Sequence, residues 1–163
     1  MADRSEDLLR LAHAVVQAAD QAEVFTLGTR LTRITQALKP ADRGQALARA
    51  TQAIADFDGG TRIGDALVAF LAVPRYAGFA RGASVVVLSD GLERGAPDVM
   101  IDAVRRLSRS AWRLDWLTPL AADPDYVPVT EGLSAILPVL DHLGDGNSSA
   151  AVTDHILTMA RRA

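Results

Sequence analysis

Thr61 and Asp90 are the residues whose side chains could bind a metal ion. Thr61 follows Gly59 and Gly60 and comes just before an apolar pattern typical of a helix. Asp90 follows the apolar run "SVVVLS" and precedes Gly91. A hard divalent cation such as Mg²⁺ prefers oxygen ligands, and a hydroxyl and a carboxylate on neighbouring loops supply two of them. The glycines would let the backbone approach such an ion closely.

Each of these residues also has a structural interpretation. Thr61 would cap the helix that follows it, and Asp90 would form an Asx-type turn with Gly91. Because short motifs often match by chance, the two residues alone favour this interpretation. Asp90 at a strand end also resembles a phosphoacceptor or the acidic residue of a small hydrolase. That chemistry needs supporting acidic residues, a lysine or a general base, and the chain's single lysine, Lys39, lies in a predicted loop.

The other candidate motifs carry less chemistry. His13, His142 and His155 lack the H-x-x-x-H spacing of metal ligands and are expected to be structural, with His13 partly exposed on a helix. The stretch "GDGNSS" lacks the alternating acidic ligands of a calcium loop, so Asn147 or Ser148 is expected to cap a helix. No nucleophile elbow, phosphate-binding loop or dinucleotide fingerprint is present in the sequence.

Composition narrows the class of protein. The chain has 163 residues, 49% of them hydrophobic and 23% charged, which fits one globular domain. The net charge of -3 argues against a nucleic acid or an anionic membrane as partner. The absence of cysteine excludes disulfides and thiolate chemistry. The N-terminal residues do not form a signal peptide and no apolar run reaches membrane-spanning length, so a cytoplasmic protein is expected.

Hydrophobic periodicity predicts an α/β, doubly wound, mostly parallel sheet with helices on both faces and an antiparallel edge hairpin. Ser5 is the expected N-cap of the first helix. Trp112 and Trp116 are expected in the core, and the strand at 83–91 is expected to be buried on both faces. Helices are predicted over 6–20, from Pro40 and Asp42, after Thr61, from Pro97, over 130–137 and after Ser149. Strands are predicted over 23–27, 30–35, 83–91, 112–119 and 139–143.

Four stretches carry a resemblance to a known family: "EVFTLGTRLTRIT", "GGTRIGDAL", "VVVLSDGLERG" and "WRLDWLTPL". In this order they resemble the von Willebrand factor A domain of the CoxE-like type, across nearly the whole chain. The resemblance implies a single, N-terminally incomplete domain over residues 1–163. It also implies a metal-ion-dependent adhesion site for Mg²⁺ or Mn²⁺, in which Thr61 matches the second loop and Asp90 the third.

The sequence departs from this family at the first loop, which carries D-x-S-x-S after the first central strand. The stretch "SEDLLRLAHAVV" matches the helix that follows that loop, which places the strand and its motif upstream of Met1. The segment from Asp3 to Asp7 reads D-x-S-x-D but has no strand before it. We therefore expect weak or absent metal binding. The missing strand would leave a slot, filled either by direct pairing of its neighbours or by self-association with a second chain.

The resemblance implies a non-catalytic adaptor. CoxE-like proteins are associated with maturation of molybdenum-containing carbon monoxide dehydrogenase, together with a MoxR-type AAA+ ATPase. A loop-bound cation would then take a carboxylate from a partner protein. Two alternatives remain open: a metal-independent interaction module or truncated relic, and a small phosphotransfer or hydrolase enzyme that uses Asp90.

Overall fold

The computed structural model describes residues 2–54, 61–123 and 125–161. These residues fall into two compact units, residues 1–60 and residues 61–163. Each unit is built from local elements with a small core of its own. The single domain over residues 1–163 stays a prediction.

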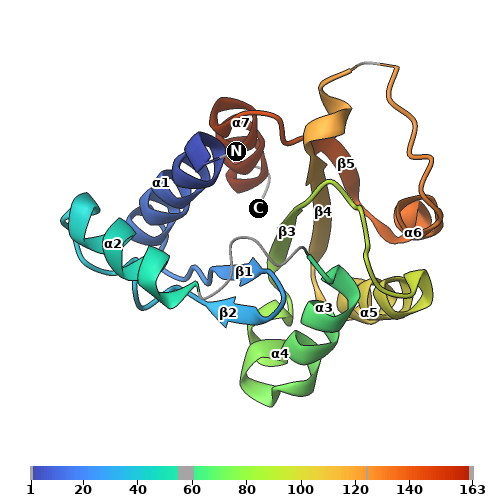
Figure 1. The fold of residues 1–163 in the computed structure, drawn as a ribbon, viewed down its shortest axis with the longest axis horizontal. Coiled ribbons are helices and arrows are strands. Elements are labelled where there is room, and N and C mark those ends of the chain that lie inside the picture. The colour runs from blue at the N-terminus through green and yellow to red at the C-terminus, as the bar shows by residue number, and fades with distance from the viewer. Residues whose placement is uncertain (1, 55–60, 124, 162–163) are drawn as a thin grey trace. The chain divides into compact units, whose positions relative to one another are not determined.

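The first unit combines two helices with a β-hairpin. Strands β1 (Phe25–Leu27) and β2 (Leu31–Arg33) pair antiparallel with Thr26 opposite Thr32, which confirms the predicted hairpin. Helix α1 (Ala2–Ala18) precedes it and helix α2 (Arg43–Ala53) follows it (Figure 1). The amide of Gln45 donates to Asp42 Oδ1 at 2.7 Å, the N-cap bond expected at the start of this helix. The unit's buried core consists of Leu9, Ile34, Leu38 and Ala50.

Two expectations in this unit are wrong. Helix α1 begins at Ala2, so Ser5 lies inside it instead of capping it, and the D-x-S-x-D segment is helical. His13 is only 7% exposed, and its Nε2 lies 2.9 Å from the carbonyl oxygen of Pro40. Burial of a polar ring is tolerated when it has a hydrogen-bond partner, and the loop before α2 supplies that partner for His13.

The second unit is built on a parallel sheet of three strands in the order β3-β4-β5 (Figure 1). Trp116 of the middle strand lies opposite Val87 of β3 and Leu143 of β5. The strands are β3 (Ser84–Leu88), β4 (Arg113–Thr118) and β5 (His142–Asp145). The helices are α3 (Ile63–Ala72), α4 (Pro74–Ala80), α5 (Pro97–Ser110), α6 (Glu131–Ile136) and α7 (Ser149–Ala160), with 3₁₀ turns at Pro119–Ala122 and Leu137–Val139.

The predicted α/β class is confirmed, because a parallel sheet flanked by helices accompanies an antiparallel hairpin. Pro97 opens α5 as expected, and its predicted inner face is buried. The middle strand β4 is nearly continuous in its burial, as is typical of a parallel strand with a neighbour on each side. The buried side chains of α5 are Met100, Ile101, Ala103, Val104 and Leu107.

Four expectations about the strands need correction. The strand β3 is not buried on both faces, since Leu88 is 40% exposed and the described residues pair β3 with β4 alone. Among the described residues, the predicted edge hairpin forms a two-stranded sheet of its own, without pairing to any strand of β3-β4-β5. Trp112 lies outside β4 and is 56% exposed, whereas Trp116 is buried as predicted. The last strand begins at His142, because Leu137–Val139 forms a 3₁₀ turn.

Among the described helices, none is by itself long and apolar enough to cross a membrane. Helices α3 and α4 together meet the length and composition of a span, but they are bent by 102° at the break between them. The predicted cytoplasmic location stays a prediction.

Candidate functional site

Asp90 lies in a tight turn at the carboxyl end of β3. Its Oδ1 accepts a hydrogen bond from the amide of Leu92 at 3.0 Å, and Ser89 Oγ accepts from the amide of Gly91 at 3.2 Å. Gly91 has a φ of 73°, a conformation that glycine adopts without strain. The Asx-type turn expected at Asp90 is therefore confirmed. One oxygen of its carboxylate is engaged by the turn.

Thr61 lies two residues before α3, and it does not cap that helix. The N-cap residue is Arg62, which makes no side-chain cap bond. Glu93 takes the place of a cap: its Oε2 accepts from the amide of Gly64 at 2.6 Å, and its Oε1 accepts from the amide of Gly95 at 2.6 Å. A carboxylate at the first turn of a helix satisfies a free amide and interacts favourably with the helix dipole.

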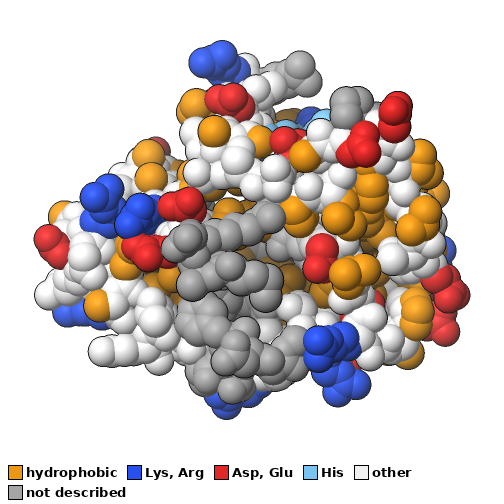
Figure 2. Space-filling view, turned by 45° about the horizontal axis from the view of Figure 1, so that its top comes forward, with side chains coloured by type: hydrophobic (Ala, Val, Ile, Leu, Met, Phe, Trp, Pro, Cys, Tyr) orange, Lys and Arg blue, Asp and Glu red, His pale blue; other side chains and the backbone are white. Residues whose placement is uncertain are grey.

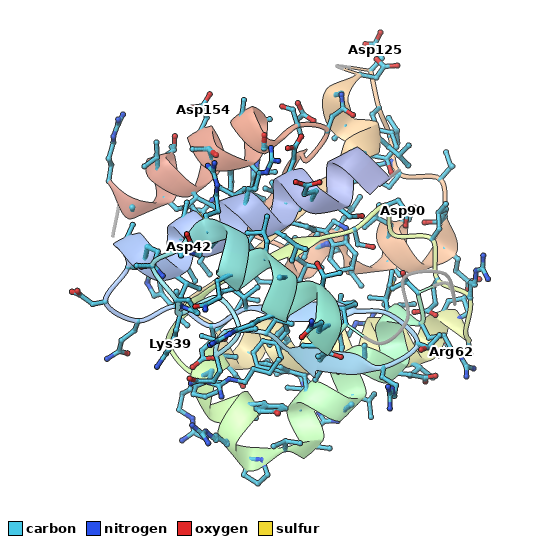
Figure 3. All side chains as sticks on the ribbon, turned by 60° about the vertical axis from the view of Figure 1, so that its left-hand side comes forward. Lys39, Asp42, Arg62, Asp90, Asp125 and Asp154 are labelled. Atoms are coloured by element: carbon cyan, nitrogen blue, oxygen red, sulfur yellow. The ribbon has the colours of Figure 1, made fainter. Side chains whose placement is uncertain are left out.

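The bonds of Glu93 bring the two predicted loops together. Glu93 lies three residues after Asp90 and bonds to Gly64, three residues after Thr61. Arg62 and Asp90 accordingly lie on the same side of the second unit in Figure 3. Gly59 and Gly60, which were expected to shape the second loop, lie outside the described residues. The structure thus places the loop of Asp90 against the start of α3, directly after Thr61.

The loop that follows β4, between the 3₁₀ turn at Pro119–Ala122 and α6, also lies beside Asp90. Burial, and then the negative charge of Asp90, raise the pKa of Tyr126. Ser134 of α6 donates to the carbonyl oxygen of Pro128 at 2.8 Å, and this bond fixes the end of the loop. Leu133 of the same helix lies against Gly91. The loops after β3 and β4 therefore form one continuous edge.

This edge exposes several apolar side chains. Val129 is 90% exposed, although its neighbours in the loop are tied to α6. Figure 2, which brings the top of Figure 1 forward, shows hydrophobic side chains exposed beside acidic ones. Exposed apolar groups in a cluster are typical of a surface that contacts another protein. The exposed residues that follow β3 and β4 are Leu92, Leu120, Val127 and Val129, with Leu88 at the end of β3.

The described residues contain no group of three or more His, Asp or Glu side chains placed to hold a metal ion. A metal ion bound by Thr61 and Asp90 would therefore take most of its other ligands from water. Mg²⁺ tolerates such a site, because it is commonly held by one or two carboxylates and keeps several waters. Metal binding by Thr61 and Asp90 stays a prediction.

Glu93 is the residue that the sequence interpretation missed. Its partner Gly64 is 29 positions away, so local patterns carry no direct sign of the contact. An indirect sign exists at the start of α3, where the residue at the N-cap is an arginine. Arginine cannot accept a bond from a helix amide, so some other part of the chain has to supply the acceptor.

Replacing Glu93 with glutamine should lower the free energy of unfolding by about 1 kcal/mol. The two carboxylate oxygens accept from two backbone amides, whereas glutamine has one oxygen and can accept from only one of them. Glutamine keeps the shape of the side chain and one oxygen. The control is Glu131→Gln, which removes the charge of an exposed glutamate in the first turn of α6. Urea unfolding followed by circular dichroism measures both variants. Equal losses in the two would show that Glu93 does no more than an exposed charge near a helix start.

Comparison with solved structures shows the fold. The crystal structure of an aerotolerance-related membrane protein from Bacteroides fragilis NCTC 9343, which carries multiple mutations to serine, matches 97% of this chain and 88% of its own. The TM-score is 0.57 and the sequence identity is 16%. At this identity the likeness supports the α/β fold and nothing about binding.

The family follows from the sequence match. Residues 1–152 match the family described as "VWA domain containing CoxE-like protein". The chain therefore belongs to the CoxE-like family of von Willebrand factor A domain proteins, as its four quoted stretches had indicated. None of the curated proteins compared with the chain matches it.

Proposed function

We propose that this protein is a non-catalytic adaptor that binds partner proteins through the carboxyl edge of its parallel sheet. Membership of a von Willebrand factor A family supports a role in protein–protein interaction. The observation that carries the proposal is the edge itself: Glu93 ties the loop of Asp90 to the start of α3, and apolar side chains are exposed beside it. A fixed turn with exposed apolar neighbours is suited to recognising another protein.

We further propose that Mg²⁺ or Mn²⁺ binds weakly at Thr61 and Asp90. One carboxylate oxygen of Asp90 accepts the Leu92 amide, which leaves the other oxygen for an ion. A cation held by so few protein ligands keeps open positions that a partner's carboxylate can occupy. The partners proposed from the family are a MoxR-type AAA+ ATPase and a molybdenum-containing carbon monoxide dehydrogenase, whose maturation the adaptor would assist.

A thermal melt with added Mg²⁺ or Mn²⁺ tests the metal site. Metal that binds only the folded protein raises the melting temperature, by about 1.4 kcal/mol of stabilisation at ten times the Kd. For a chain of this length that is roughly 3–6 °C. The matched variant is Asp90→Asn, because asparagine keeps the oxygen that accepts the Leu92 amide and removes only the charge. We expect the rise in the wild type and a much smaller one in this variant.

The same variant tests the partner. Binding of the purified MoxR-type ATPase from the same organism is measured by calorimetry for the wild type and for Asp90→Asn. We expect weaker binding by the variant at equal Mg²⁺. Melting temperatures that do not change at millimolar metal would contradict the metal site. Unchanged affinity for the ATPase together with a metal-dependent melt would contradict the role of the ion in recognition.

A metal-independent interaction module is the second candidate. It is favoured by the Asx-type turn, because the bond from Leu92 to Asp90 gives this carboxylate a structural role without any ion. In that case the apolar side chains of the edge carry the contact. Replacing Val127 and Val129 with serine would then weaken partner binding, while Asp90→Asn would leave it unchanged.

A further inference from the structure

A second cluster of charged side chains lies on β4, away from the candidate site. Asp115 is fully buried, and both of its carboxylate oxygens accept bonds from Arg113 Nε, at 2.9 Å and 2.8 Å. His155 Nε2 lies 2.6 Å from Asp115 Oδ2. Arg113 and Asp115 share one face of the strand, because side chains alternate along it. A buried carboxylate on the sheet is therefore shared by an arginine of the same strand and a histidine of α7.

The bond between His155 and Asp115 joins α7 to the sheet. Figure 1 shows α7 on one side of the strands, with α5 and α6 on the other. The side-chain bonds of Thr153 and Thr158 stay within the helix, at Ser149 and Asp154. In the described part of the chain, no other side-chain hydrogen bond runs from α7 to a strand. Apolar packing also holds this helix, since Val152 is buried and Ile156 and Met159 are half-buried. Its polar tie to the sheet is a bond between two titratable groups.

His142 completes the cluster. It lies opposite Asp115 in the pairing of β4 with β5, and its ring stacks on that of His155 with centroids 4.8 Å apart and planes at 14°. Burial lowers the pKa of His142, and the charges of His155 and Arg113 lower it further, while Asp115 partly opposes them. We call these four side chains the α7 clasp: Arg113, Asp115, His142 and His155.

The net charge of the α7 clasp is zero only while both histidines are neutral. Arg113 and Asp115 cancel each other. Protonation of both imidazoles would place three positive groups around one carboxylate, with two of them stacked face to face. The His155 side chain is only 14% exposed, whereas His142 is exposed, so like charges at this separation repel but water screens part of the repulsion. In the described residues, the neighbouring carboxylates do not compensate for them. Asp141 accepts the Leu114 amide at 2.8 Å, and Asp154 of α7 is exposed and points outward in Figure 3.

We propose that the α7 clasp is an acid-sensitive device that holds α7 against the sheet while His142 is neutral and loosens the helix when His142 takes up a proton. The inference is independent of any metal at Thr61 and Asp90. Helix α7 starts at Ser149, and just before it the amide of Gly146 donates to the carbonyl oxygen of Thr118 at 2.9 Å, at the carboxyl edge of the sheet. Loosening of α7 would therefore reach the edge that carries the candidate site.

The direction of the pH effect follows from linkage. In the released state His142 regains its ordinary pKa of 6.5, which is higher than its pKa in the clasp. Between these two values the released state binds more protons than the closed state. Attachment of α7 therefore strengthens as the pH rises and weakens as it falls below about 6.5.

Hydrogen exchange followed by mass spectrometry tests the proposal at pH 7.5 and pH 5.5, after correction for intrinsic exchange rates. We expect the protection of the α7 peptide to fall on the order of three- to tenfold at the lower pH, as for a single shifted group. The protection of the α5 peptide should stay constant. A parallel loss in both peptides would mean general unfolding and would overturn the proposal.

Three variants sharpen this test. His142→Asn removes the titrating imidazole and should abolish the acid loss of α7 protection. His155→Gln keeps a neutral donor to Asp115 and removes only the repulsion from His155, so it should lessen the loss without abolishing it. Asp154→Asn removes an exposed carboxylate from the same helix and should behave like the wild type. Acid loss that persists in His142→Asn, or an α7 peptide whose protection does not change with pH in the wild type, would overturn the proposal.

Discussion

Replacing Trp116 with alanine should lower the free energy of unfolding by about 3–5 kcal/mol, because a large buried side chain leaves a cavity in the middle of the sheet. Trp116 is fully buried on β4, between Val87 of β3 and Leu143 of β5. At a slope near 2 kcal/mol/M, the urea midpoint should fall by roughly 1.5–2.5 M. Urea unfolding followed by far-ultraviolet circular dichroism measures the shift.

The second tryptophan supplies a matched control. Trp112 is 56% exposed and lies outside β4, so Trp112→Ala should cost less than about 1 kcal/mol. The same substitution at two positions four residues apart then isolates the effect of burial. Similar midpoints for the two variants would contradict the position of Trp116 in the core.

A milder change separates packing from hydrogen bonding. The indole Nε1 of Trp116 donates to the carbonyl oxygen of Ser89 at 3.0 Å, just before Asp90. Trp116→Phe keeps most of the apolar volume and leaves that carbonyl without its donor, which should cost about 1–3 kcal/mol. Because this bond positions the residue preceding Asp90, the variant should also weaken any stabilisation by Mg²⁺.

The two tryptophans show how far periodicity predicts the fold. Alternation along the strand at 112–119 correctly placed Trp116 inside, but it says nothing about where the strand begins. Strand β4 starts at Arg113, so Trp112 has no neighbouring layer to cover it. By contrast, the face of α5 was predicted correctly, because a long helix repeats its pattern over several turns and Pro97 marks its start.

Contacts between distant segments could not be predicted in this way. The bond of Glu93 to Gly64 and the bond of His155 to Asp115 join residues 29 and 40 positions apart. Each depends on how the chain returns to the same place, which local patterns do not record. The sequence does contain one hint at β4, where Arg113 and Asp115 put opposite charges on one face of a strand that is otherwise apolar. A buried charge requires a partner, and Arg113 and Asp115 supply one for each other, so the pair predicts a buried charge but does not predict the contact with His155.

The burial of β3 was overestimated for a related reason. An unbroken run of valines is typical of a parallel strand covered on both faces. Its first and last residues, Ser84 and Leu88, are exposed, and the described residues give β3 one neighbour, β4. Composition records what a strand can bury, whereas its exposure depends on which strands pair with it.

Replacing Gly64 with alanine should destabilise the protein by about 2–4 kcal/mol. A Cβ atom at this position would lie 2.7 Å from the amide nitrogen of Met100 and 3.1 Å from the carbonyl carbon of Val99, both backbone atoms of α5. Because backbone cannot rotate out of the way, α3 would have to move from α5, at a cost of about 1–3 kcal/mol. The same movement would stretch the bond from the Gly64 amide to Glu93, which adds about 1 kcal/mol.

Gly78 of α4 provides the control, since nothing lies within 4 Å of the Cβ that an alanine would add there. Gly78→Ala should stabilise the protein by about 0.5–1 kcal/mol, because alanine loses less backbone entropy in a helix. Thermal melts should therefore move in opposite directions, with Gly64→Ala lower by roughly 4–16 °C. Because the loop of Asp90 is fixed through Gly64, the Gly64→Ala variant should also lose its response to Mg²⁺. A Gly64→Ala protein that melts like the wild type would show that α3 and α5 do not approach this closely.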